Sequence, residues 1–170
     1  PERFDVIEWI KLIISWDSNA QIILHGVSMG AATVLMASGE ELPENVKAII
    51  ADCGYTSEWD EFKCEANALH IQWFPVLNAA SVMSRLRDGY DFKQASALEQ
   101  VKQSRIPTLF IHGSDDELVP YSMLDKLYSA AACEKECLTV DGAGHALSSS
   151  VEPELYWNTV ESFIDKYLEK

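Results

Sequence analysis

The chain has 170 residues, 48% of them hydrophobic, which suits one globular domain with its own core. Its formal net charge of −14 repels phosphate backbones and anionic lipid headgroups, and so argues against nucleic-acid partners and against adsorption to membranes. No apolar run approaches the roughly 18 residues that a membrane-spanning helix needs, and no signal peptide is visible.

Helices and strands are expected to alternate along the chain. Apolar residues at helical spacing predict an amphipathic helix over residues 3–16, whose inner face carries Val6, Trp9, Ile10, Ile13 and Ile14. Continuous apolar runs predict four strands at Gln21–His25, Val46–Ala51, Ile106–His112 and Glu136–Val140. Further helices are predicted at residues 29–38, 121–132 and 154–168.

The four predicted strands do not alternate between apolar and polar residues, and helices separate them. This pattern is typical of parallel strands that are buried on both faces. We therefore expect one α/β domain over residues 1–170, with a parallel sheet of about four strands between helices.

Residues 56–104, between the second and third strands, are too long for a simple crossover. The segment is rich in aromatic residues, and Pro75 and Gly89 divide it into three expected helical pieces. Such an insertion could be a lid over a pocket. Alternatively, its aromatic side chains simply pack it onto the rest of the domain.

The chain has four cysteines, with no CxxC pair and no zinc-ligand spacing: Cys53, Cys64, Cys133 and Cys137. We expect free thiols, as in a reducing compartment, and therefore a cytoplasmic location. A disulfide between Cys53 and Cys64 is the alternative.

The segment Gly26-Val27-Ser28-Met29-Gly30 has the pattern G-x-S-x-G. It follows an apolar strand and opens a helix of small residues, which is the setting that presents a reactive serine on a sharp turn. Side chains at Gly26 and Gly30 are expected to collide with that turn. The helix that starts at Met29 directs N–H groups at the site, so the Met29 amide is the expected first donor to an oxyanion.

A serine nucleophile needs a base and an orienting acid, which in this setting follow in the order serine, acid, histidine. Both residue types occur at strand ends. His112-Gly113-Ser114-Asp115-Asp116-Glu117-Leu118-Val119-Pro120 follows the third strand, and Asp141-Gly142-Ala143-Gly144-His145 follows the fourth.

The segments G-V-S-M-G-A, I-H-G-S-D-D-E-L-V-P and G-A-G-H resemble those of the α/β-hydrolase superfamily. They are most similar to its bacterial lysophospholipase-like or serine-aminopeptidase-like branch. The resemblance implies Ser28 as nucleophile, His145 as base and Asp116 as acid. Asp116 stands three residues after the Gly of H-G and three before the Val of V-P, and Asp115 meets neither spacing. Asp52 and Asp141 are alternative acids.

The other three histidines have structural interpretations. His25 is expected to be packed and hydrogen-bonded, His112 to brace the acid loop, and His70 to lie on the surface or in the insertion. The acidic run at residues 115–117 lacks the ligand pattern of a calcium loop, so no metal is expected.

The resemblance also implies that part of the fold lies outside this chain. The familiar fold has eight strands, and the serine turn follows the fifth. Four strands would be missing here, together with the loop that gives the second oxyanion N–H. The edge of Gln21–His25 would then be bare, to be covered by a missing N-terminal segment or by self-association. The chain could be a fragment, one half of a split protein, or an ordered part.

The function expected from these residues is hydrolysis of a carboxylic ester by acyl transfer through Ser28, His145 and Asp116, without a cofactor. The substrate would be a small ester or a short peptide. Two alternatives stay open: a serine peptidase or amidase with the same residues, and a non-catalytic interaction domain on the same fold.

Overall fold

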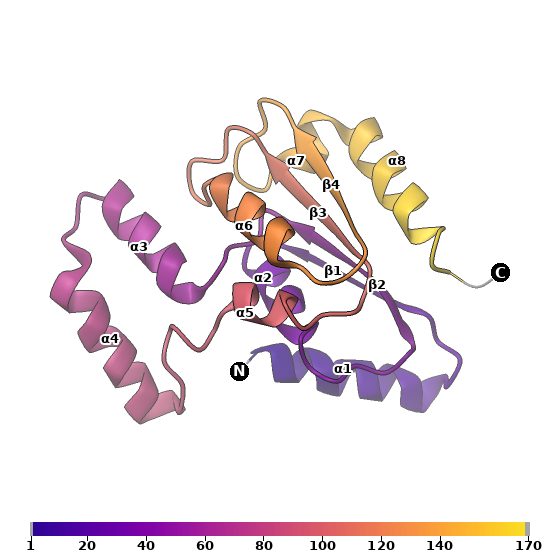
Figure 1. Ribbon diagram of the computed structural model, residues 1–170, viewed down its shortest axis with the longest axis horizontal. Coiled ribbons are helices and arrows are strands. Elements are labelled where there is room, and N and C mark those ends of the chain that lie inside the picture. Colours follow the sequence, from indigo (N-terminus) through magenta and orange to yellow (C-terminus); the bar gives the residue numbers. More distant parts are fainter. Residues whose placement is uncertain (1, 169–170) are drawn as a thin grey trace.

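A computed structural model describes residues 2–168 of the chain, except for the side chain at position 88. Its centre is a four-stranded sheet in the order β1-β2-β3-β4, and every neighbouring pair is parallel (Figure 1). The strands are β1 (Ile22–Val27), β2 (Val46–Asp52), β3 (Thr108–Gly113) and β4 (Lys135–Val140). The expected parallel α/β architecture is confirmed.

Eight helices are assigned within the described residues. They are α1 (Glu2–Trp16), α2 (Met29–Ala37), α3 (Glu58–Ala68), α4 (Trp73–Asp88), α5 (Ala97–Val101), α6 (Ser122–Ala130), α7 (Ser148–Val151) and α8 (Pro153–Ile164). Over residues 2–168, no helix combines the length and apolar character needed to cross a bilayer.

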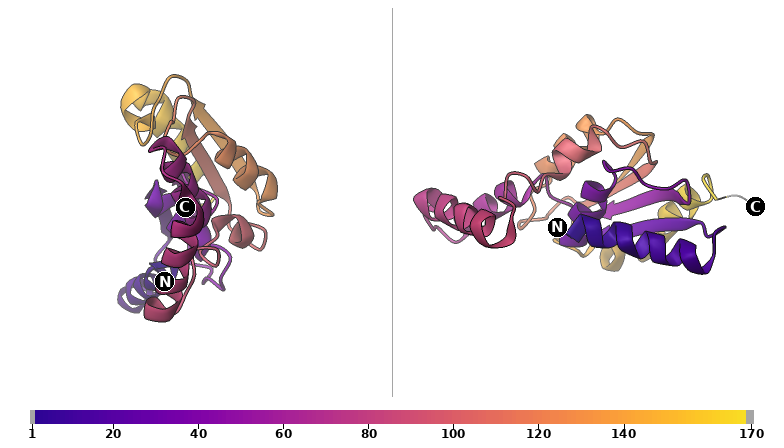
Figure 2. Two further views of the ribbon diagram at one scale, coloured as in Figure 1. Left: turned by 90° about the vertical axis from the view of Figure 1, so that its left-hand side faces the viewer. Right: turned by 90° about the horizontal axis from the view of Figure 1, so that it is seen from below.

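The sheet separates two apolar cores, because strands that are apolar throughout bury side chains on both faces. One face packs against α1, α2, α5 and α6, and its fully buried members include Ile10, Leu35 and Phe110. The other face packs against α8 through Tyr156 and Phe163. Figure 2 shows α6 and α8 on opposite sides of the sheet.

The insertion leaves and re-enters the domain through one narrow neck. Ser57 and Ser96 form an isolated antiparallel bridge there, and the Leu98 N–H donates to the Thr56 carbonyl at 2.9 Å. Beyond the neck, α3 and α4 pack on each other and project on the side toward which the strands run (Figure 1).

The aromatic residues of the insertion pack mainly among themselves. Trp59 meets Trp73 edge to face, and Phe62 contacts Phe92 with ring centroids 4.8 Å apart. Many of its apolar side chains are exposed: Leu69, Ile71, Phe74, Val76, Val82, Met83 and Leu86. Tyr90, by contrast, packs against the main core of the domain.

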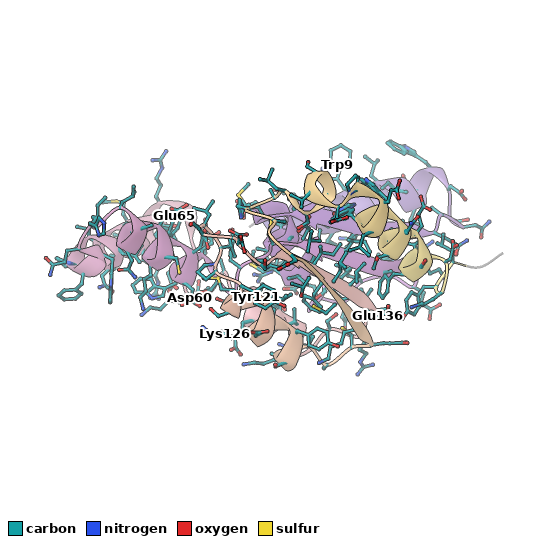
Figure 3. The ribbon with its side chains drawn as sticks, turned by 90° about the horizontal axis from the view of Figure 1, so that it is seen from above. Trp9, Asp60, Glu65, Tyr121, Lys126 and Glu136 are labelled. Atoms are coloured by element: carbon teal, nitrogen blue, oxygen red, sulfur yellow. The ribbon has the colours of Figure 1, made fainter. Side chains whose placement is uncertain are left out.

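The elements follow the sequence closely, with three differences. Trp9 was expected on the inner face of α1, but it is 62% exposed and lies at the periphery of the molecule (Figure 3). The short helix α7 was not predicted. The insertion has one more break than expected: α3 ends at Ala68, and the expected interruption at Pro75 follows separately, because Phe74 just before it has a non-helical φ of −90° and ψ of 132°.

β1 forms one edge of the sheet, as the resemblance implied. The Ser28 N–H, just past the strand, donates to Asp52 at the end of β2. Because peptide groups alternate in direction along a strand, Ile23, His25 and Val27 turn their main-chain groups away from β2. The neighbouring helix α1 adds exposed apolar side chains at Phe4, Trp9, Leu12 and Trp16.

We therefore expect the isolated 170-residue chain to self-associate, since an open strand edge beside an apolar surface is a template for pairing. Light scattering should give a mass above the 19.0 kDa of one chain. A longer version that supplies a further strand beside β1 should be monomeric by the same measurement. A monodisperse 19.0 kDa species from the isolated chain would contradict this expectation.

Candidate active site

The turn between β1 and α2 holds Ser28 in an unusual backbone conformation. Its φ of 55° and ψ of −118° are rarely adopted by a residue with a side chain, so the turn stores strain. A hydrogen bond of 2.8 Å from the Ser28 N–H to the Asp52 carbonyl offsets that strain. The serine hydroxyl is thereby presented at the end of the sheet rather than along it.

The two glycines of the turn have different roles. A Cβ on Gly26 would lie 2.3 Å from the Gly30 carbonyl, so no side chain fits at Gly26. A Cβ on Gly30 would meet nothing within 4 Å. The expectation that a side chain at Gly30 would collide with the turn is therefore wrong. Gly30 contributes the backbone that Gly26 touches.

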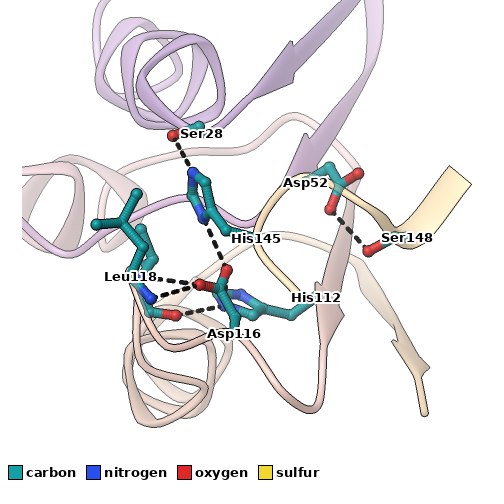
Figure 4. A network of polar contacts seen from close by, with 8 residues as sticks. Ser28, Asp52, His112, Asp116, Leu118, His145 and Ser148 are labelled. Atoms are coloured by element: carbon teal, nitrogen blue, oxygen red, sulfur yellow. Dashed lines mark hydrogen bonds and ion pairs between the residues drawn. The ribbon is translucent and has the colours of Figure 1, made fainter. Parts of the chain in front are cut away.

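The structure brings the three predicted side chains together in one line (Figure 4). The Ser28 Oγ lies 2.8 Å from the His145 Nε2, and the His145 Nδ1 lies 2.8 Å from the Asp116 Oδ2. A carboxylate can only accept, so the Nδ1 carries the proton that it donates to Asp116. The Nε2 of the neutral ring is then the acceptor for the serine hydroxyl.

The carboxyl group of Asp116 is completely buried and fully hydrogen-bonded. Its Oδ1 accepts from the N–H groups of Leu118 and Val119 at 3.0 and 2.9 Å. Burial by itself raises the pKa of Asp116, but the hydrogen bonds from His112, His145 and the Val119 N–H outweigh it and hold that pKa below its usual value. Asp116 is therefore ionised at neutral pH.

The competing acids point elsewhere. Asp115 and Asp141 both converge on the Ser114 hydroxyl, at 2.9 and 3.2 Å. Asp52 accepts a hydrogen bond from the Ser148 hydroxyl at 3.3 Å. Only Asp116 of these four carboxylates forms a hydrogen bond with His145 in the described structure.

The other histidines have the expected environments, with one exception. His25 is hydrogen-bonded as expected, with its Nε2 3.0 Å from the Tyr156 hydroxyl, but the residue is exposed rather than packed. Partial burial of its ring lowers the pKa of His25. His112 is fully buried and its Nε2 donates to the Val119 carbonyl at 2.9 Å, which braces the loop that carries Asp116. His70 is exposed on the insertion.

Met29 begins α2, and the first turn of a helix leaves N–H groups without partners in the helix. The Met29 amide is thus in the position expected for an oxyanion donor. Its own side chain is 65% exposed beside the serine.

One thiol lies against these residues. Cys53 is fully buried, and its sulfur, a ring nitrogen of His145 and an oxygen of Asp116 all lie within 4.8 Å of one another. This is a donor set that zinc could use. However, burial raises the pKa of Cys53 to about 12, and His145 and Asp116 are already hydrogen-bonded to each other. We therefore base no metal site on it.

The sequence alone did not identify the residues around Asp52. Ser148 and Tyr156 reach this carboxylate from α7 and α8. Ser148 is one of three consecutive serines, and Tyr156 follows a helical apolar pattern. Neither carries a signal that separates it from an ordinary surface or core residue. All four cysteines are free, so a bridge between Cys53 and Cys64 is not formed.

Known proteins resemble this chain in sequence. A Bacillus subtilis protein, YqkD, is 30% identical over 168 residues, covering 96% of this chain and 54% of YqkD. Lysophosphatidylserine lipase ABHD12 from Macaca fascicularis is 30% identical over 131 residues, covering 77% of this chain and 32% of the lipase. The chain thus spans about half or less of these relatives.

Solved structures show the same fold. An acetyl xylan esterase from Paenibacillus sp. R4 superposes with a TM-score of 0.74 at 18% identity, covering 98% of this chain and 52% of the esterase. The prolyl oligopeptidase family matches residues 3–170. With the parallel sheet and the serine turn described above, this match places the chain in the prolyl oligopeptidase family of the α/β-hydrolase superfamily.

Proposed function

We propose that the protein is a serine hydrolase that cleaves carboxylic esters by acyl transfer. The observation that carries the proposal is the unbroken line of hydrogen bonds from Ser28 through His145 to Asp116, at 2.8 Å each. A buried ionised acid, a correctly oriented neutral imidazole and a strained serine are the components that such a reaction needs.

In the proposed reaction the Ser28 Oγ attacks the carbonyl carbon while the His145 Nε2 takes the hydroxyl proton. Asp116 stabilises the imidazolium that forms and keeps the ring in the required tautomer. The imidazolium then protonates the departing alcohol, which leaves an acyl ester on Ser28. Water, deprotonated by His145, releases the acid and restores the serine. No cofactor takes part.

The negative charge on the carbonyl oxygen requires N–H donors. The Met29 amide is the proposed first donor. The second is proposed to come from a segment outside this chain, which would also pair with the open edge of β1. Partial coverage of YqkD and of the esterase supports such a segment.

The substrate class follows from two further observations. The names of two relatives, a lysophosphatidylserine lipase and an acetyl xylan esterase, support an ester. The net charge of −14 supports a small ester or short peptide rather than a nucleic acid.

Four free thiols support a reducing, cytoplasmic environment.

A peptidase or amidase that uses the same three residues is the second candidate, because the matching family is named for an oligopeptidase. Two substrates with one acyl group, a p-nitrophenyl ester and the matching p-nitroanilide, separate the candidates. A kcat/KM for the anilide equal to or above that for the ester would favour the peptidase. A non-catalytic domain would hydrolyse neither.

In the full-length protein, Ser28→Ala should abolish labelling by a fluorophosphonate probe and the burst of p-nitrophenol from p-nitrophenyl acetate. The reason is that the alanine has no oxygen to acylate. Gel fluorescence and stopped-flow absorbance measure the two effects. Labelling and turnover that persist unchanged in a folded Ser28→Ala variant would refute the nucleophile assignment.

Asp116→Asn should lower kcat by about 10³–10⁴-fold with the fold intact, because the amide no longer holds the required tautomer of His145. Asp115→Asn is a matched control, since the neighbouring carboxylate contacts Ser114 instead. Its turnover should stay within about twofold of wild type, as expected for an exposed polar substitution. Equal losses in the two variants would contradict the choice of Asp116.

The α3–α4 arm is proposed to act as a lid that contacts the acyl chain of the substrate. Its exposed apolar side chains and its position beyond the strand ends support this role. Met83→Gln together with Leu86→Gln should then lower kcat/KM for p-nitrophenyl dodecanoate by about tenfold or more, given the value of burying such side chains. The rate with p-nitrophenyl acetate should change little.

Leu155→Gln on α8 is the control for the lid, because it is a similarly exposed apolar residue on another face of the domain. The Leu155→Gln variant should change kcat/KM for p-nitrophenyl dodecanoate and for p-nitrophenyl acetate to the same small extent. A double lid variant that treats both esters as wild type does would contradict a lid that contacts the acyl chain.

A further inference from the structure

Asp52 stands at the end of β2, where the serine turn and the histidine loop approach each other (Figure 4). It is only 2% exposed, and the proposed reaction gives it no role. Its main chain and its side chain each hold a different part of the site.

The main chain of Asp52 holds the nucleophile. Its carbonyl accepts the Ser28 N–H at 2.8 Å. This is a hydrogen bond to the residue whose backbone is strained, so the position of the serine depends directly on where the end of β2 lies.

The side chain of Asp52 holds the loop that carries the base. The Ser148 hydroxyl donates to its Oδ1 at 3.3 Å, and Ser148 is fully buried at the start of α7. His145 lies shortly before Ser148, and the intervening Ala146 has a φ of 56°. The loop therefore bends sharply between the base and this anchor.

A second hydroxyl interacts with the carboxylate of Asp52. The Tyr156 hydroxyl, from α8, hydrogen-bonds to Asp52, and His25 Nε2 lies 3.0 Å from the same hydroxyl. Burial lowers the pKa of His25, so its neutral ring donates to the tyrosine oxygen while the tyrosine proton goes to Asp52. The carboxylate is tied in this way to α8 and β1.

The charged neighbours of Asp52 affect its own ionisation. Burial raises the pKa of Asp52, whereas the hydrogen bonds from Ser148 and Tyr156 and the nearby rings of His112 and His145 act to lower it. Cys53 beside it is kept protonated mainly by burial, and its pKa is raised further by the charge of Asp52. Asp52 and His145 thus interact electrostatically without touching.

We propose that Asp52 is the positioning residue of this site, because its carbonyl and its carboxylate together set the separation of the Ser28 Oγ and the His145 Nε2. The inference rests on the proposed function and deepens it. Asp116 orients the imidazole ring, while Asp52 fixes the two loops on which nucleophile and base are mounted.

The test uses the full-length protein and p-nitrophenyl acetate. Asp52→Ala should lower kcat by about 10²-fold with KM nearly unchanged, because misplacement by about 1 Å can cost that much. Ser148→Ala and Tyr156→Phe each remove one donor to the carboxylate, so each should lower kcat to a smaller extent, by several-fold, again with little change in KM. Asp141→Asn, another strand-end acid, is the control and should match wild type.

The pH dependence of kcat/KM is a second readout, because a loss of packing alone would not shift it. A negative charge at Asp52 favours the imidazolium that forms during the reaction, and asparagine removes that charge. Asp52→Asn should therefore move the acidic limb of kcat/KM to lower pH. Asp141→Asn should leave the limb in place.

Several outcomes would overturn the inference. These are a folded Asp52→Ala variant with wild-type kcat, or Ser148→Ala and Tyr156→Phe variants that match wild type while Asp52→Ala does not fold. A fixed acidic limb in an active Asp52→Asn variant would also overturn it. Failure of the proposed function would be seen separately, as a wild-type protein that is not labelled by fluorophosphonate.

Discussion

The backbone of the chain reverses so tightly after β1 that Gly26 lies against the carbonyl of Gly30. This close approach forces the intervening serine into a positive φ and aims its hydroxyl away from the sheet. The strain is held in place by neighbours that are themselves fixed. The end of β2 accepts the Ser28 N–H, and two buried cores clamp the sheet from either side. The rest of the site is arranged around this one turn.

Parallel strands explain why so much of the site could be predicted. All four strands end on the same side of the sheet, so residues that follow β1, β3 and β4 must meet there. The registers of Ser28, Asp116 and His145 within their motifs were sufficient to choose them. The geometry also separates Asp116 from Asp115 next to it, because only Asp116 turns toward the ring.

The features that the sequence did not predict are those that depend on which helices pack against each other or against the sheet. Helical periodicity predicts the apolar stripe of α1, but it cannot tell that Ile10 is buried while Trp9 in the same stripe is exposed. The environment of Asp52 was hidden for the same reason. Its partners come from α7 and α8, far along the chain, and a hydroxyl that meets a carboxylate leaves no local pattern.

The neck of the insertion has an evolutionary consequence. Because Ser57 and Ser96 are paired across it, the two ends of the α3–α4 arm are held together by the domain itself, whatever lies between them. The entropy of closing such a loop grows only slowly with its length, so the arm could lengthen, shorten or be exchanged at small thermodynamic cost. The reacting groups would keep their geometry meanwhile. Related enzymes could therefore acquire new substrate preferences by replacing a single module, without reworking their chemistry.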